Sequence, residues 1–436
     1  MTFVPKIFGT CDVFPEEHKY FTFLKKVYRH EFRKNGFRRI STPLFEHTDM
    51  LAKIFWTSVV EDMMYSFPWN AGTSYSLRPD ASIGSMRAYI EWNLESELQP
   101  VYLYHMDRYF RKNSLWVGVS KEFYFIWAEV IGESDPIIDA QQIYMNYETL
   151  NAIGLAWDFS IKINFLWNKK ELEKYIEELK NFYENKKHLL SETSLENLKS
   201  QPLKLLTPQN EDEKILISQA PSIVKFLKKD SKEYYSKVKE YLDLLKVPYT
   251  EDHTLLHYFD YYNGFVWRID STISGENIAI GGRYDSLSTK IGYEDVIPAS
   301  GFTVRVDQLV KGLKEKKIAI KNKDKIDLYF VQLWDEAKKA VLPISLEARE
   351  KGINTLSSLG TPAIKEQMLK AQRIGAKFVV IVWVMEARNG KFQVRNIEDW
   401  TQSEVHKDKL IEYIISKIGK DKLDFYSPAR DLVFWK

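Results

Sequence analysis

Cysteine and net charge are both scarce in this sequence. Cys11 is the only cysteine in 436 residues, which excludes an internal disulfide and a cysteine-based zinc site and is typical of a reducing compartment. Lysine and arginine number 62 against 60 aspartates and glutamates. No strong overall field therefore attracts nucleic acid or anionic lipid, and any contact with RNA is expected to be local.

Long apolar runs are also missing. The longest, Phe378 to Met385, is far shorter than the roughly 20 residues that a membrane-spanning helix requires, so we expect a buried strand there and no membrane partner. The first 20 residues contain acidic side chains and no long apolar core. They predict neither a secretion signal nor a transit peptide, and the predicted location is cytoplasmic.

Length and composition predict several folded domains. The chain has 436 residues, of which 44% are hydrophobic, whereas single cores stop growing near about 250 to 300 residues. Residues 169–247 contain no glycine and repeat apolar side chains every three or four positions, which predicts a helical insertion. The charged run 311–325 is interpreted as a solvated helix end and linker, rather than as an RNA-binding patch.

Strand signals on both sides of the insertion predict one mixed domain in two parts, and a β-α repeat follows the linker. The predicted boundaries are 1–168 and 248–322 for the two parts of the mixed domain, 169–247 for the insertion and 326–436 for a C-terminal α/β domain.

Short strings of polar, aromatic and glycine residues are spread over nearly the whole chain. Any one of them is weak evidence, but their number, order and spacing make a chance match remote. They are GTCDVFP at Gly9 to Pro15; Gly36, Phe37, Arg39, Ile40, Pro43 and Glu46; Leu77, Arg78, Pro79, Asp80, Ser82 and Arg87; Phe110, Arg111, Glu122, Phe123, Glu129, Ile131 and Gly132; Leu255, Leu256, Asp260, Tyr261 and Tyr262; GGRYD at Gly281 to Asp285; and Pro298, Ala299, Gly301 and Phe302.

In this order the strings resemble those of the histidyl-tRNA synthetases, which belong to the class II aminoacyl-tRNA synthetases. The resemblance implies an α+β fold: an antiparallel sheet with flanking helices, a helical insertion and a C-terminal domain similar to an anticodon-binding domain. It also implies a homodimer. For an active member it implies histidine, ATP with Mg²⁺ and tRNA as the molecules bound.

The resemblance places three arginines around ATP, and two of them are replaced here. Activation attacks the α-phosphate of ATP and needs fixed positive charge at the phosphates. Arg111 stands at the first position and is the expected catalytic residue, but His257 and Gln308 stand at the other two. A neutral imidazole offers neither a fixed charge nor a bidentate fork for phosphate. We therefore expect impaired catalysis.

Further departures surround the implied nucleotide site. Arg305 stands where the family pattern has glycine, and we expect its side chain to block the adenine pocket or, with Arg111, to contact any nucleotide that binds. Phe125 replaces a glutamine that faces the amino acid. The loop of motif 2 is also more apolar than in the family, so aminoacyl transfer to tRNA is expected to suffer; its changed residues are Asn113, Leu115, Trp116 and Val119.

The implied amino-acid pocket is better preserved. Its carboxylates, hydroxyls and guanidinium suit a zwitterion such as histidine. The alternative is that Asp80 and Glu129 only pair with Arg78 and Arg111 inside a buried sheet. The pocket residues are Asp80, Ser82, Arg111, Glu129, Tyr262 and Tyr284.

A metal site is not expected. His253 and His257 lie four residues apart, a spacing that places two side chains on one face of a helix. No acidic partner follows them in the pattern that metalloproteases use.

Three functions remain open. The first is a catalytically impaired paralogue that senses histidine or regulates a partner enzyme, as does a known relative, the regulatory subunit of ATP phosphoribosyltransferase, which usually lacks the anticodon-binding domain. The second is an active, divergent histidine–tRNA ligase in which Lys121, Arg268, Arg283 or Arg305 supplies the missing charge. The third is a tRNA-binding or scaffold protein that uses the C-terminal domain and the insertion.

Overall fold

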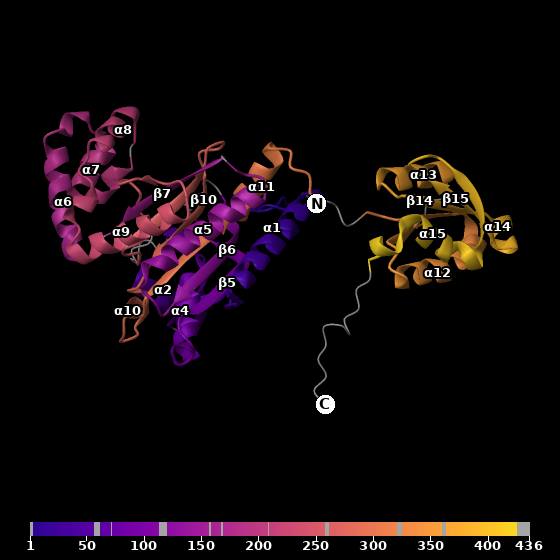
Figure 1. Cartoon of the computed structure of the whole chain (residues 1–436), viewed down its shortest axis with the longest axis horizontal. Helices are drawn as coiled ribbons and strands as arrows, with labels where there is room; N and C mark the ends of the chain where they lie inside the picture. Colours follow the sequence, from indigo (N-terminus) through magenta and orange to yellow (C-terminus); the bar gives the residue numbers. More distant parts are fainter. Residues whose placement is uncertain are drawn as a thin grey trace. The chain divides into compact units, whose positions relative to one another are not determined.

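Contacts divide the chain into two compact units, residues 1–320 and 321–436 (Figure 1). Among the described residues, no helix has the length and apolar character needed to cross a membrane. The computed structural model describes residues 3–55, 62–70, 72–112, 120–156, 158–166, 169–207, 209–257, 261–320, 325–359 and 363–424.

An eight-stranded sheet forms the centre of the first unit (Figure 1). Its strands lie in the order β1-β5-β6-β11-β10-β9-β7-β8. Neighbours are antiparallel except for the edge pairs β1/β5 and β7/β8, which are parallel. Strands from before and after the insertion thus share one sheet. The strands are β1 (Arg38–Arg39), β5 (Val101–Phe110), β6 (Glu122–Ile131), β7 (Phe159–Phe165), β8 (Thr250–Glu251), β9 (Phe265–Ser271), β10 (Asn277–Arg283) and β11 (Ala299–Arg305).

Four helices cover one face of this sheet. Their apolar side chains and alternate residues of the strands, such as Ile126, Ala128 and Val130 of β6, form the largest core cluster. The helices are α1 (Pro15–Lys34), α5 (Pro136–Ala152), α9 (Lys229–Leu244) and α11 (Val306–Glu315).

Shorter helices cover part of the opposite face, where a second core cluster lies. They are α2 (Thr48–Ile54), α4 (Ser82–Glu91) and α10 (Leu287–Ile291). Beside them lies a small antiparallel sheet of order β2-β4-β3, formed by β2 (Phe45–His47), β3 (Ser66–Asn70) and β4 (Thr73–Leu77). The rest of this face of the large sheet carries the candidate site.

In the described part of 169–247 all regular elements are helical. Helices α6 (Lys169–Glu184), α7 (Glu192–Ser200) and α8 (Glu211–Ser218) form a group with its own apolar cluster (Figure 1). Helix α9 leads back to the sheet. Short 3-10 helices occur at Leu94–Ser96, Lys187–Leu189, Pro202–Leu206, Ile223–Phe226, Lys407–Lys409 and Lys420–Lys422.

The second unit has a five-stranded sheet of order β13-β12-β14-β15-β16. The first three strands are parallel and the last two antiparallel. The buried strand expected from 378 ends at Val382, and a helix begins at Val384. The elements are β12 (Leu328–Gln332), α12 (Trp334–Glu350), β13 (Thr355–Ser357), α13 (Ile364–Arg373), β14 (Phe378–Val382), α14 (Val384–Asn389), β15 (Lys391–Asn396), β16 (Gln402–His406) and α15 (Leu410–Ile418).

Candidate functional site

A small cavity of about 10 Å³ lies over β6, β10 and β11, which is about the room that one water molecule needs. Strand register explains its walls. Phe125, Trp127 and Glu129 alternate along one face of β6, and they pair with Arg305, Thr303 and Gly301 of β11. The lining residues are Arg111, Phe125, Trp127, His257, Tyr262, Asn277, Ile280, Thr303 and Arg305.

Two buried carboxyl groups lie next to this cavity, on the side of α4. Asp80 accepts hydrogen bonds from the Tyr261 hydroxyl at 2.8 Å and from the Ile83 amide at 3.2 Å. Glu129 accepts one from the Ser82 hydroxyl at 2.9 Å. The sequence places Asp80 in the amino-acid pocket but does not identify Tyr261 as its hydrogen-bond donor, although Tyr261 directly precedes the expected Tyr262.

Burial controls the protonation of both groups. Desolvation raises the pKa of Glu129 well above its ordinary value, the hydrogen bond from Ser82 opposes this rise, and the charge of Asp80 adds to it. Desolvation also raises the pKa of Asp80, against the hydrogen bond from Tyr261. Such groups favour a ligand that brings a cation or a hydrogen-bond donor.

Two polar atoms near Gly301 have no hydrogen-bond partner in the described part of the chain. They are Oε2 of Glu129 and the hydroxyl of Tyr284, and both are buried. A β-carbon at Gly301 would collide with Oε2 of Glu129 and would lie 2.7 Å from the Tyr284 hydroxyl. Glycine therefore keeps space open where a donor and an acceptor converge.

Arg111 joins this polar region to the cavity. It directly follows β5, its side chain is buried, and its Nε donates to the Pro79 carbonyl oxygen at 3.0 Å. Arg78 takes a different direction: it donates to the Thr42 carbonyl oxygen at 2.9 Å and lies 3.8 Å from the carboxylate of Asp107. Of the two arginines in the alternative pairing, Arg78 is directed to Thr42 and Asp107, whereas the charge of Arg111 acts on Asp80.

His257 stacks face to face on Tyr262, with ring centroids 3.3 Å apart and planes 12° from parallel. Desolvation and, to a smaller degree, the charge of Arg111 hold the pKa of His257 well below its ordinary value. The ring is thus a neutral imidazole at physiological pH. The expectation that His253 and His257 share a helix face is wrong, since both lie in turn and irregular backbone, and His253 bonds the Ile217 carbonyl oxygen.

Arg305 lines the cavity but does not present a free charge to it. Its guanidinium lies 2.9 Å from the carboxylate of Asp307 and 3.3 Å from that of Glu276. Gln308 donates to the same Asp307 carboxylate at 3.3 Å. Two acidic groups, Asp307 and Glu276, therefore balance the positive charge of Arg305.

Two of the other cations expected as replacements, Arg268 and Arg283, are held in ion pairs of their own. Arg268 forms an ion pair with Asp270 at 2.8 Å, and Arg283 belongs to the network described below. Lys121 is half-buried, and its backbone oxygen accepts from the Arg111 amide at 3.1 Å.

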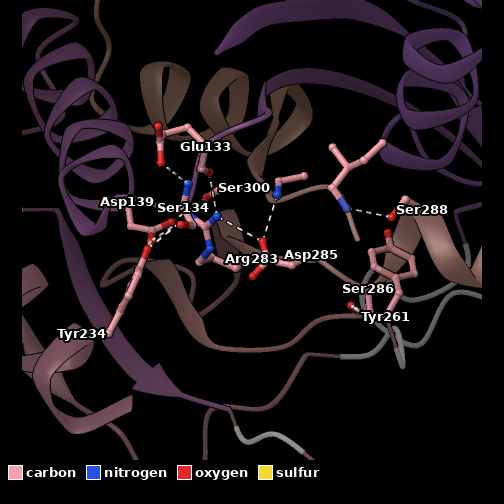
Figure 2. A network of polar contacts seen from close by, with 12 residues as sticks. Glu133, Ser134, Asp139, Tyr234, Tyr261, Arg283, Asp285, Ser286, Ser288 and Ser300 are labelled. Carbon is pink, nitrogen blue, oxygen red and sulfur yellow. Dashed lines mark hydrogen bonds and ion pairs between the residues drawn. The ribbon is translucent and has the colours of Figure 1, made fainter. Parts of the chain in front are cut away.

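Arg283 of the GGRYD string is the centre of a buried polar network (Figure 2). It lies 3.6 Å from Asp139 and 3.0 Å from Asp285, and it donates to the Tyr234 hydroxyl at 3.1 Å. Asp139 also accepts from Tyr234 and Ser300, each at 2.5 Å. The network fixes α5, α9, β10 and β11 against one another, so the role of Arg283 here is structural.

Some expected features fall outside the described residues, namely the motif 2 loop at 113–119 and positions 258–260. Within the described ranges, no group of three or more histidine, cysteine, aspartate or glutamate side chains is placed to hold a metal ion. The cavity walls at Trp127, Asn277, Ile280 and Thr303 were not identified from the sequence. The alternation along β6 and β11 was the available signal for Trp127 and Thr303.

Comparisons with known proteins cover both units. The histidyl-tRNA synthetase family matches residues 9–309, and the anticodon binding domain family matches 318–417. The chain is 31% identical over 408 residues to the histidine–tRNA ligase of Halothermothrix orenii, which covers 93% of this chain and 97% of that protein. It is 30% identical over 410 residues to the histidine–tRNA ligase of Bacillus subtilis, covering 92% and 96%.

Solved structures of related proteins resemble this chain as well. The apo histidyl-tRNA synthetase of S. aureus superposes with a TM-score of 0.76 at 28% identity, covering 95% of this chain and all of that one. An ATP phosphoribosyltransferase regulatory subunit/histidyl-tRNA synthetase from Bacillus halodurans C gives a TM-score of 0.63 at 20% identity, covering 85% and 97%. The second likeness concerns the fold alone.

Proposed function

The chain belongs to the histidyl-tRNA synthetase family and has its class II fold, and on that premise we propose that it binds histidine but has lost most ATP-dependent activation. The observation that carries the proposal is the small amount of unbalanced positive charge around the cavity. His257 is neutral there, and the Arg305 guanidinium is balanced by Asp307 and Glu276. Arg111 is left as the one expected ATP-contacting arginine.

The electrostatic argument concerns the growing charge at phosphorus. A donor aimed at such a charge typically contributes about 3 to 4 kcal/mol to the transition state. Gln308 supplies a neutral amide that already bonds Asp307, and His257 supplies a neutral ring. Neither replaces a guanidinium, which is always charged and matches phosphate in a bidentate way.

The histidine half of the site keeps the groups that a zwitterion needs. We assign Asp80 to the ammonium group, Arg111 to the carboxylate, and Glu129 with Tyr284 to the imidazole, with Ser82 and Tyr262 around them. The support for Glu129 and Tyr284 is the pair of buried atoms without partners beside Gly301. Since the cavity is small, histidine binding requires side chains to move.

Histidine is therefore expected to raise the melting temperature of the full-length protein by about 2 to 4 °C at a hundredfold excess over its Kd. Glu129→Gln keeps the shape of the side chain but removes its carboxyl group, and it is expected to raise the Kd for histidine at least about tenfold. Glu122→Gln is the matched control, because Glu122 lies on the same strand but pairs with Arg108 at its edge. An unchanged melting temperature of the wild-type protein in the presence of histidine would contradict the proposal.

The second candidate is an active histidine–tRNA ligase, which would use ATP with Mg²⁺. Two observations favour it: the two ligases above match nearly the whole chain, and Arg111 is retained in the cavity wall next to Lys121. This candidate requires that Arg111 and Lys121 together stabilise the phosphate charge that three arginines stabilise in the family. Histidine-dependent pyrophosphate exchange separates the two candidates.

Partners follow from the family. We propose a homodimer, supported by an apolar surface on the small sheet where Phe45, Phe67 and Trp69 are 54%, 47% and 68% exposed; sedimentation at the monomer mass would argue against it. We also propose tRNA as a partner of residues 318–417, a regulated enzyme as an alternative partner, and a cytoplasmic location.

A further inference from the structure

The ring of His257 occupies the face of Tyr262 that borders the cavity. With centroids 3.3 Å apart and nearly parallel planes, the two rings are in direct contact, and no third ring fits between them. Both nitrogens of the His257 ring are buried, although the residue as a whole is half-buried. The cavity that remains holds about one water molecule.

The surroundings of this ring are those of a site for a planar, neutral, polar heterocycle. Tyr262 is held in place by Tyr261, stacked at 4.8 Å, and by Tyr284, edge-on at 5.7 Å. Arg111 and Asn277 line the same cavity and have polar side chains. The aromatic platform is thus fixed by neighbours other than His257.

We propose that His257 is a built-in occupant of this pocket, and that removing its ring opens a site for a free neutral azole such as imidazole. The inference deepens the proposed function at the same site, but it does not require that wild-type protein binds histidine. If histidine does bind with its ring on Tyr262, it must first displace His257. The chain then contains an internal competitor for its own ligand.

The test uses the full-length His257→Ala variant, which lacks only the imidazole ring. At pH 8 we expect about 20 mM imidazole to raise its melting temperature by about 2 °C, the size expected for a site roughly tenfold above its Kd. Wild-type protein and His257→Phe, whose pocket stays filled, are expected to shift by less than about a quarter of that. Equal shifts in all three proteins would overturn the proposal.

Two further measurements separate this idea from folding defects and from the histidine proposal. His257→Ala/Tyr262→Leu is expected to lose the imidazole response, because the stacking platform is gone. If His257→Ala does not fold, NMR of the His257 ring in the wild-type protein tests the proposal instead. A stacked, enclosed ring is expected to give ring-current-shifted signals that do not titrate near pH 6.5. Signals that titrate near pH 6.5 would refute the proposal. Absence of histidine binding leaves the imidazole result unchanged, so the two failures are distinguishable.

Discussion

Histidine-dependent exchange of pyrophosphate into ATP is expected to run at least about ten-thousandfold slower with this protein than with an active ligase of the family. The proposal assigns this loss to two absent guanidinium contacts to the phosphates, each worth about a hundredfold to a thousandfold in rate. His257 and Gln308 stand at those positions, and the Arg305 side chain is bound to Asp307 and Glu276. The measurement compares both enzymes at saturating histidine and ATP with Mg²⁺.

Two controls make this comparison decisive. The Halothermothrix orenii ligase, which is 31% identical, serves as the active standard if it exchanges pyrophosphate under the same conditions. The histidine-induced rise in melting temperature reports that the protein used is folded and able to bind. Exchange within about a hundredfold of the standard would support the active-ligase alternative and would show that Arg111 and Lys121 suffice.

Arg283→Met is expected to destabilise the first unit by about 3 to 5 kcal/mol, because it leaves Asp139 buried without its cation. The side chain of Asp139 has no exposed surface, and that of Arg283 is 3% exposed. Burial acts to lower the pKa of Arg283, but the carboxylates of Asp139 and Asp285 together hold this pKa above its ordinary value. Unfolding in urea, followed by tryptophan fluorescence, measures the loss.

Arg268→Met is the matched control for that prediction. Arg268 is an arginine of the neighbouring strand β9, its side chain is 26% exposed, and it pairs with Asp270, so its loss is expected to cost about 1 kcal/mol or less. Arg283→Met/Asp139→Asn is expected to recover part of the stability, since the uncompensated carboxylate is removed. Equal costs for the two arginine variants would contradict the assigned role of the network.

Local sequence signals predict several of the elements of the first unit. The apolar spacing of residues 17–35, which ends before Gly36, predicts a helix there, and α1 spans Pro15–Lys34. The Pro-Asp pair at 79–80 predicts a helix over 82–95, but this helix ends at Glu91, because Asn93 takes a left-handed conformation and a separate 3-10 turn follows. The α+β class and the C-terminal anticodon-binding domain, inferred from the resemblance, are confirmed.

In the second unit, the hairpin of β15 and β16 is an element that the sequence interpretation did not include. The end of this unit was predicted as alternating strands and helices, but β15 and β16 form an antiparallel hairpin before the last helix. Phe392 and Val394 are buried, whereas Lys391 is exposed. That alternation is the period of a half-buried strand, and it was present in the sequence.

The site residues were predicted from the resemblance, but their contacts were not, because contacts depend on distant segments. Glu276 reaches Arg305 across 29 positions, and Tyr261 reaches Asp80 across 181. From the sequence, the family resemblance places His257 and Gln308 at two positions expected to hold arginine. That His257 would stack on Tyr262, and that Arg305 would be balanced by two carboxylates, required the strand register and the burial of each group.

Equilibrium binding of ATP tests the central claim most directly, because it measures whether the pocket holds a triphosphate without depending on any later step. Calorimetric titration of ATP with Mg²⁺ into the wild-type protein is expected to give no saturable heat up to about 1 mM ATP. This concentration would reveal a Kd below about 1 mM, which corresponds to a binding free energy of about −4 kcal/mol. Histidine, titrated into the same preparation, is expected to bind. One-to-one ATP binding with a micromolar Kd would contradict the account.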